Sequence, residues 1–573
     1  MKKEILYTLS AALLLGGCTK KLDYTYDNRT VQLPNTPSNS RIVNLAGATE
    51  LKINGQALTS FLLPSIEGFY GADNTKGTRW FPESGRLGTT YTIPKEVFNN
   101  GLADSVLFST LNPKNAAPNA RPFSIREDEA KTFDYYFVWF LPNANGKMDS
   151  LFRIPRDISA SVNPAAFKLR LLNLSSVEGA NSLPGIYRKG PMTVTFADGT
   201  TVPGLSNVQP GTYSEYIDIP YGTYQFKVLD SDGKEVLATG GGYNTLNPNT
   251  GTLLDINGTP GMGGYKDTWL TYAPVKTFQP GGVYTIAVSS NYDTRVSNGN
   301  PNGETVPADN NVFRIINDVT EPLNYTYARM QGVNAMTGQP ITWMVDGKVL
   351  SDALPFGKAG DYNIFITGKH TLQAISSDKK ILADTTFFLD AADNISAWLY
   401  ANSAGQPGVT LVSNNLSAKY TSGKAADDGT YNTLKDAYPF WIRFMNFCPD
   451  MKEVSFMGNN GQGFISPVQA NATGNLHVPF AQPVVTEPYA RMIVNFTSNI
   501  QVHASQPTVL PGDWMRNVSS LNSQQFIAHP ELYKHTSLPG SEPGVYTVAL
   551  IGRNTSDAGT ADKARMIIVK HTK

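Results

Sequence analysis

A short motif, an arginine followed by two apolar residues and an asparagine, recurs four times along this chain of 573 residues. The copies begin at Arg41, Arg170, Arg314 and Arg443, so successive arginines are 129, 144 and 129 residues apart. A period of this length matches one β-sandwich domain rather than one short solenoid repeat. The repetition therefore predicts four related domains in series.

Two further marks accompany the motif in each repeat. One is an Asn-Gly or Asp-Gly pair, which tolerates the positive φ angles of a two-residue hairpin turn. The other is an alternating aromatic and apolar segment in which Tyr284, Ile286 and Val288, for example, share one face of a strand. The turn pairs begin at Asn54, Asp198, Asp346 and Asn460, and the closing strands are expected at 135–140, 283–288, 395–400 and 545–550.

Composition and periodicity both favour an all-β fold. The chain holds 50 Gly, 37 Pro, 27 Tyr and 27 Phe, and helical periodicity is almost absent. We expect 216–220 and 224–228 to form a hairpin in the second repeat, with a counterpart at 362–366 and 370–375 in the third. The arginine of the motif is expected to pair near a domain boundary, and its asparagine to bind loop backbone at a strand end.

The predicted organisation is a signal peptide, a tether and four tandem β-sandwich domains. The signal covers residues 1–17 and a flexible tether covers 18–39. The sandwiches are expected at 40–160, 166–303, 312–425 and 438–573, separated by polar linkers.

The repeated strand, the Gly222-Thr223-Tyr224 segment and the closing Tyr-Thr strands (Tyr284-Thr285 and Tyr546-Thr547) together resemble a bacterial family of immunoglobulin-like domains. The family is known as domain of unknown function 4397, and the resemblance is best in repeats two and three. It implies immunoglobulin-like sandwiches and an exported or lipid-anchored protein of the Bacteroidetes type. It implies no activity.

The N-terminus is typical of a bacterial lipoprotein signal. Lys2 and Lys3 precede a short apolar segment that ends in Leu15-Gly16-Gly17-Cys18. The segment is too short to span a bilayer permanently, whereas an acylated Cys18 would anchor the mature chain by lipid. The predicted location is the outer membrane, with the cell surface favoured over its periplasmic face. An ordinary secretory signal with a chance cysteine is the alternative.

Several classes of chemistry lack support in the sequence. Lys plus Arg equals Asp plus Glu at 47 each, and a near-neutral chain argues against binding of nucleic acid, which calls for a basic surface. No metal-ligand spacing or cofactor motif is present, and no cofactor is expected. Ser376 and Lys379 match a Ser-x-x-Lys pattern without its companion motifs, and Cys448 is expected to be a small buried hydrophobe. An enzyme is therefore not predicted, although paired carboxylates of an unrecognised hydrolase stay open.

Recognition remains as the expected function. Aromatic faces stack on sugar rings, and we expect an irregular stretch from His503 to Gly544 to form a ligand-binding loop. The candidate ligand-binding residues are Trp514, Arg516, Tyr533, Trp80 and Tyr70. The leading hypothesis is a lipid-anchored protein that captures glycan or another nutrient, acting alone or beside an outer-membrane transporter. The alternative is a structural or adhesive lipoprotein whose domains act as spacers.

We predict that Cys18→Ala abolishes lipid attachment, because the substitution removes the thiol that would be acylated. Growth with a clickable fatty acid followed by membrane fractionation measures this directly. Undiminished lipid labelling of the variant would contradict the lipoprotein assignment.

Overall fold

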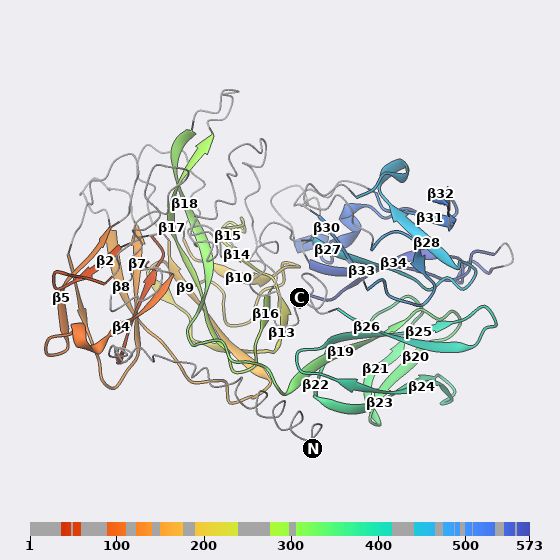
Figure 1. Cartoon of the computed structure of the whole chain (residues 1–573), viewed down its shortest axis with the longest axis horizontal. Coiled ribbons are helices and arrows are strands. Elements are labelled where there is room, and N and C mark those ends of the chain that lie inside the picture. Colours follow the sequence, from red (N-terminus) through yellow and green to blue (C-terminus); the bar gives the residue numbers. More distant parts are fainter. Residues whose placement is uncertain are drawn as a thin grey trace, which may run out of the picture. The chain divides into compact units, whose positions relative to one another are not determined.

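The computed structural model describes residues 36–46, 48, 50–58, 87, 89–109, 122–139, 149–175, 190–238, 276–296, 305–414, 440–464, 474–485, 488–492, 499–506, 508–532, 542, 544–555 and 558–573. These residues form an all-β protein of tandem β-sandwich domains, as predicted, and their only helical elements are short 3-10 turns. Figure 1 colours the strands from red and orange in the first sandwich to blue in the fourth. Cys18, Tyr70, Trp80 and Tyr533 lie outside the described residues.

Sandwich 1 comprises two four-stranded sheets. The first has the order β4 (Thr90–Pro94), β1 (Pro37–Asn44), β7 (Phe133–Trp139) and β8 (Asp149–Pro155). The second has the order β3 (Gln56–Ala57), β2 (Glu50–Ile53), β5 (Leu102–Ser109) and β6 (Phe123–Arg126). The 3-10 turn η1 covers Lys95–Val97.

Sandwich 2 is built on a six-stranded sheet. Its order is β11 (Thr212–Tyr213), β9 (Ala166–Leu174), β17 (Val283–Val296), β18 (Thr305–Asn317) and β15 (Leu237–Ala238), and β12 (Ile217–Pro220) also pairs with β9. Two smaller sheets pair β10 (Thr193–Phe196) with β14 (Phe226–Leu229), and β13 (Gly222–Tyr224) with β16 (Lys276–Phe278). Phe167, Phe226, Phe278 and Tyr284 stack or meet edge to face in the core.

Sandwich 3 pairs two four-stranded sheets. The first has the order β22 (Asn363–Ile366), β19 (Tyr327–Asn334), β25 (Asn394–Ala401) and β26 (Pro407–Ser413). The second has the order β21 (Lys348–Leu354), β20 (Ile341–Val345), β23 (Gly368–Ser376) and β24 (Ile381–Leu389). Their apolar faces meet around Trp343, Leu372 and Leu399.

Sandwich 4 repeats this plan. Its first sheet has the order β30 (Tyr489–Met492), β27 (Phe440–Asn446), β33 (Gly544–Ile551) and β34 (Arg565–Lys570). Its second sheet has the order β29 (Val478–Pro479), β28 (Glu453–Met457), β31 (Gln501–Gln506) and β32 (Val509–Trp514). Three 3-10 turns, η2 (Asn459–Gly461), η3 (Ser523–Phe526) and η4 (Pro530–Leu532), complete it.

The same strand pairing recurs in sandwiches 2, 3 and 4. The first strand runs parallel to the penultimate one, in the pairs β9–β17, β19–β25 and β27–β33. The last strand then runs antiparallel to the penultimate one. All four expected closing strands exist, as β7, β17, β25 and β33, and Tyr284, Ile286 and Val288 face the core as predicted.

The register corrects the motif of the third repeat. Arg170 pairs with Thr285 and Arg443 pairs with Thr547, and the equivalent pair in sandwich 3 is Gln331 with Ser396. The Arg314–Asn317 segment lies instead in β18, the last strand of sandwich 2. The four-residue motif reflects the alternation of residues at a buried strand end, wherever that strand lies in the sandwich. It therefore also occurs in β18, which is not a first strand.

The motif asparagine closes the loop that follows the first strand, as predicted. Its amide donates to a loop carbonyl and its carbonyl accepts a loop N–H, which satisfies buried backbone that no strand reaches. Asn173 donates to the carbonyls of Gly190 (3.0 Å) and Val208 (2.9 Å) and accepts from the Ser175 N–H at 3.1 Å. The same role falls to Asn44, Asn334 and Asn446.

The predicted turns also form. Both residues of Asn54–Gly55, Asp346–Gly347 and Asn460–Gly461 have positive φ, and the first two pairs connect the hairpins β2–β3 and β20–β21. The pair Asp198–Gly199 also forms a turn, but only the glycine has positive φ.

The predicted hairpins within repeats two and three are wrong. In sandwich 3, β22 pairs with β19 of one sheet whereas β23 pairs with β20 and β24 of the other. In sandwich 2, β12 pairs with β9 whereas β14 pairs with β10. The chain crosses between sheets at Gly222 and Gly368, where the sequence shows only two strands separated by a turn.

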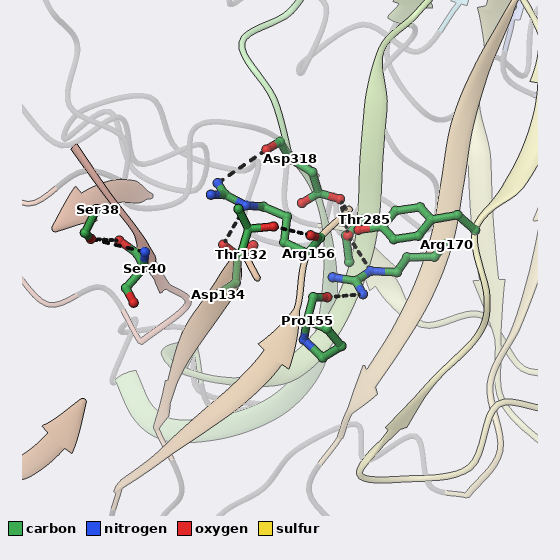
Figure 2. Close-up of polar contacts among 10 residues, drawn as sticks. Ser38, Ser40, Thr132, Asp134, Pro155, Arg156, Arg170, Thr285 and Asp318 are labelled. Carbon is green, nitrogen blue, oxygen red and sulfur yellow. Dashed lines mark hydrogen bonds and ion pairs between the residues drawn. The ribbon is translucent and has the colours of Figure 1, made fainter. Parts of the chain in front are cut away.

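Two expected boundaries differ from the strands. The strand β1 begins at Pro37, inside the expected tether, and Ser38, shown with Ser40 in Figure 2, is buried there. A linker was expected near 297–311, but residues 305–311 lie within β18. Residues 156–165 are irregular, and Val162 among them is fully exposed. The remaining domain limits stay predictions.

Besides the core of each sandwich, two apolar clusters join sandwiches in pairs. One combines Val43, Leu45, Tyr136, Val138 and Ile154 of sandwich 1 with Leu172, Leu174, Ala287 and Ile316 of sandwich 2. The other combines Val333, Ala335, Trp398 and Val412 of sandwich 3 with Met445, Phe447, Ala481, Ala549, Ile551 and Val569 of sandwich 4. Equivalent strands contribute on both sides, so each pair is joined through matching sheets.

Candidate functional site

The motif arginine lies where sandwiches 1 and 2 meet. Arg170 on β9 is 1% exposed, and its Nε donates to Thr285 Oγ1 at 2.9 Å. Its Nη1 donates to the carbonyl of Pro155, the last residue of β8, at 2.7 Å. The guanidinium also lies 4.5 Å from the centre of the Tyr216 ring. The predicted pairing at a domain boundary is thus confirmed for Arg170 (Figure 2).

Buried acids balance this arginine. Asp318 accepts from Thr285 Oγ1 at 2.5 Å and from the Tyr216 hydroxyl at 2.9 Å. Arg156 donates to the Asp318 carbonyl at 3.4 Å and lies 3.4 Å from the Asp134 carboxylate (Figure 2). Burial opposes the charged form of Arg170, but the surrounding tyrosines and the two aspartates raise its pKa overall. The two positive and two negative groups neutralise one another, so the cluster is a structural connection and offers no unbalanced charge to a ligand.

Sandwiches 3 and 4 meet through equivalent residues. Arg443 on β27 donates to the Ser413 carbonyl at the end of β26 and to Asn414 Oδ1 at 3.3 Å. Asn414 in turn donates to Ser396 Oγ at 2.8 Å. The Arg443 guanidinium lies 4.6 Å from the centre of the Tyr489 ring, as the Arg170 guanidinium lies against Tyr216.

His571 completes this second connection. Its Nε2 lies 2.8 Å from Thr547 Oγ1, and its Nδ1 lies 2.7 Å from the Tyr362 hydroxyl and 3.2 Å from Gln331 Nε2. An amide nitrogen can only donate, so Nδ1 accepts and Nε2 carries the hydrogen that Thr547 receives. Burial, together with Arg443 and Arg329, lowers the pKa of His571 well below 6.5. The imidazole is neutral, and a proton on Nδ1 would break the hydrogen bond from Gln331 and force the Tyr362 hydroxyl to reverse its role.

The exposed aromatic surface lies elsewhere, at the edge of sandwich 4. Trp514 ends the edge strand β32 and is 44% exposed, as are Val509 at 48% and Leu510 at 54% on the same strand. The Arg516 guanidinium carbon lies 5.6 Å from the centre of the Trp514 ring. The structure thus brings together two of the predicted ligand-binding residues.

His503 is a neighbour that the sequence did not single out. It is the register partner of Trp514 on β31 and is 5% exposed. Its Nδ1 lies 3.2 Å from the Gly512 carbonyl and therefore donates to it, which leaves Nε2 as an acceptor without a donor. A lone histidine gives no motif, and only its alternation with the core residue Val502 could have placed it on this face.

The described part of the loop predicted from His503 to Gly544 is more regular than expected. It includes the end of β31, all of β32 and the 3-10 turns η3 and η4. Asn522 and Gln525 form a capping box at η3, so both amides already serve the backbone. Phe526 is buried and meets Tyr546 edge to face at 5.0 Å.

A buried ion pair anchors the far end of this loop. Lys570 Nζ contacts Glu542 Oε1, and the other carboxylate oxygen accepts from the Ala528 N–H at 2.9 Å. Glu542 is fully buried. Losing Lys570 would therefore leave the buried Glu542 carboxylate without its partner and weaken the attachment of the loop.

The other motifs have structural roles. Ser376, Asp378 and Lys379 form the turn between β23 and β24, where Ser376 Oγ contacts Asp378. Cys448 lies in the core of sandwich 4 as predicted, and burial raises its pKa to about 11. Within the described part of the chain, no three His, Cys, Asp or Glu residues gather into a metal site. No helix among the described residues could span a membrane.

Comparisons with known proteins give little further information. No family model and no curated protein matches the chain. The crystal structure of a proposed cell adhesion protein from Bacteroides fragilis aligns with 65% of this chain and 97% of its own, at 11% identity and a TM-score of 0.13. The Bacillus anthracis TIE protein aligns with 62% of this chain at 10% identity and a TM-score of 0.08. The chain spans about half of that second protein, 48% of its length. Superpositions this poor assign no function.

We predict that acid weakens the connection between sandwiches 3 and 4 through His571. The folded-state pKa lies below the unfolded value of 6.5, so the unfolded chain binds more protons below that pH. The stabilising effect is complete above pH 6.5 and falls as the pH drops, by at most about 1.4 kcal/mol per pH unit.

Urea unfolding at pH 7.5, 6.5 and 5.5 measures this effect. His571→Gln is the control, because Gln keeps a donor and an acceptor but does not titrate. The variant should be less stable at pH 7.5 but lose less stability on acidification. Equal pH dependence of the two proteins would show that His571 is not the titrating group.

Proposed function

We propose that this protein is a lipid-anchored envelope protein that binds carbohydrate at the edge of its fourth sandwich. The observation that carries the proposal is the exposed Trp514 ring with the Arg516 guanidinium above it. Lipid attachment at Cys18, placement on the cell surface and action beside an outer-membrane transporter belong to the same proposal.

Exposure of this indole needs a reason. Trp343, Trp398 and Trp441 are each fully buried, because a tryptophan gains more from burial than almost any other side chain. Trp514 instead presents its ring to solvent beside Val509 and Leu510. Such a surface, on a chain whose other tryptophans with described side chains are buried, is typical of a binding site.

A sugar suits the chemistry of this edge. Its C–H face stacks on an indole while its hydroxyls hydrogen-bond at the rim, where Arg516 offers several donors. Among the described residues this edge alone combines exposed tryptophan with a neighbouring guanidinium.

A structural or adhesive spacer is the second candidate function. The apolar clusters that join sandwiches 1 with 2 and 3 with 4 support it, because buried interfaces of this kind stiffen a chain of domains. A spacer requires no ligand. The two functions therefore differ in whether the purified chain binds anything at its exposed edge.

We predict that Trp514→Ala weakens binding to a glycan by about 1–3 kcal/mol, or roughly 5- to 150-fold in Kd. The chain from Thr19 to Lys573 is screened on a glycan array, and the hit is titrated by calorimetry. Melting of the variant should hardly change, because the ring is already exposed.

Tyr325→Ala is the matched control, since Tyr325 is an exposed aromatic of sandwich 3. It should leave the affinity unchanged. A lower melting temperature for Trp514→Ala would mean that the ring supports the fold. The absence of any glycan ligand would favour the spacer.

A further inference from the structure

Arg314 on β18 carries a charge that nothing in the described part of the chain balances. Its Nε and Nη2 atoms are buried, and neither has a hydrogen-bond partner among the described residues. Burial alone shifts the pKa of Arg314, downward to about 10, so the guanidinium still holds its charge at neutral pH. A buried charge without a counter-ion destabilises a fold, and such groups are candidates for ligand-binding sites.

Two other arginines at the junction of sandwiches 1 and 2 are balanced. Arg170 and Arg156 lie with the carboxylates of Asp134 and Asp318 (Figure 2). Along β18 the nearest member of that cluster is Asp318, which follows Arg314 by 318 − 314 = 4 residues. Four residues of extended strand span roughly 13 Å. The two acids therefore serve the junction and leave the charge of Arg314 unmatched.

The register places Arg314 on the outer face of the six-stranded sheet. Arg314 pairs with Ala287 of β17, and paired residues of antiparallel strands point to the same face. Ala287 packs in the cluster that joins sandwiches 1 and 2, whereas Phe313, one residue before Arg314, lies in the core of sandwich 2. Figure 1 shows β17 and β18 side by side. Arg314 therefore lies on the face that meets sandwich 1.

Ser289 supplies a second buried polar group on this face. It pairs with Val312, so it is a diagonal neighbour of Arg314 across the two strands. Ser289 is 1% exposed, and its Oγ has no hydrogen-bond partner in the described part of the chain. Diagonal neighbours lie within reach of a side chain as long as arginine. Adjacent strands thus present unsatisfied donors from Arg314 and Ser289.

The two unsatisfied nitrogens of Arg314 suit an oxyanion. The Nε–H and Nη2–H bonds form one edge of the planar guanidinium and point in nearly the same direction. Such an edge donates two parallel hydrogen bonds to the oxygens of a carboxylate or a phosphate. A serine hydroxyl beside it can donate a third. Ala287 and Val312 are buried on the same face, and apolar surroundings strengthen the attraction between a guanidinium and an anion.

We propose that Arg314 and Ser289 bind the oxyanion of a small ligand, a carboxylate or a phosphate group. The anion supplies the counter-charge that no described residue provides, and it accepts two hydrogen bonds from Arg314 and one from Ser289. Arg314 is not fully buried, so its exposed part gives the anion a route from solvent. The site lies on sandwich 2 and is independent of carbohydrate binding at Trp514 in sandwich 4.

Calorimetric titration of the chain from Thr19 to Lys573 with sodium phosphate, and separately with sodium acetate, tests the proposal at constant ionic strength in sodium chloride. At least one anion should bind with a Kd on the order of 1 mM, and the tighter of the two identifies the group that the site takes. Arg314→Met should weaken this binding at least about 10-fold, because it removes both donors of the fork. Arg314→Lys should weaken it about 5-fold, because lysine keeps the charge without the fork. Ser289→Ala should weaken it about 3-fold.

Arg553→Met is the matched control, because Arg553 is an exposed arginine that Asp450 already balances at 3.2 Å. It should leave the Kd unchanged. The anion that binds should also raise the melting temperature of the wild-type chain but not that of Arg314→Met, since a ligand stabilises only the state that binds it. The proposal is overturned if neither anion binds, if Arg314→Met and Arg314→Lys bind as tightly as the wild-type chain, or if Arg553→Met weakens binding as much as Arg314→Met.

Discussion

The first strand of each sandwich is apolar on both faces, and the arrangement of sandwiches in pairs depends on its outer face. In β27, Phe444 faces the core of sandwich 4, whereas the adjacent Met445 faces sandwich 3. In β9, Leu171 and Leu172 divide in the same way between their own core and sandwich 1. A strand of this kind cannot leave its outer face in water without exposing a row of large side chains.

The outer face of the first strand also carries a polar residue, and the role of that residue explains why arginine recurs there. Arg170 and Arg443 lie two residues before the outward-facing Leu172 and Met445, and each donates to the carbonyl at the end of the preceding sandwich. Gln331 occupies this position in sandwich 3, where it meets neutral His571. The polar residues at this position thus hold one sandwich to the next, a role in assembly.

Much of this fold could be predicted from the sequence because the repeats carry local signals. The Asn-Gly turns, the closing strands and the loop-binding asparagines each depend on a few adjacent residues. The third repeat could not be placed this way, since Gln331 replaces the arginine and Arg314 supplies a chance copy in β18. The hairpins failed for a related reason: whether β22 and β23 share a sheet depends on partners far along the chain.

The candidate site was only partly accessible to sequence reasoning. Trp514 and Arg516 were found because an aromatic and a guanidinium lie close together outside the repeated strands. Strand β32 itself was not expected, and pairing across it is what brings His503 beside Trp514. Asn522 and Gln525, which the sequence leaves available, are already engaged in a capping box.

Hydrogen exchange after substitution of Met445 tests most directly whether the outer face of the first strand joins the sandwiches. Met445→Lys should raise amide exchange in β25 of sandwich 3 as well as in β33 of sandwich 4, while β17 of sandwich 2 stays protected. Phe444→Ala, one residue away on the inner face, should affect sandwich 4 first. If Met445→Lys raises exchange in sandwich 4 alone, the two sandwiches are not coupled through this strand and the account is wrong.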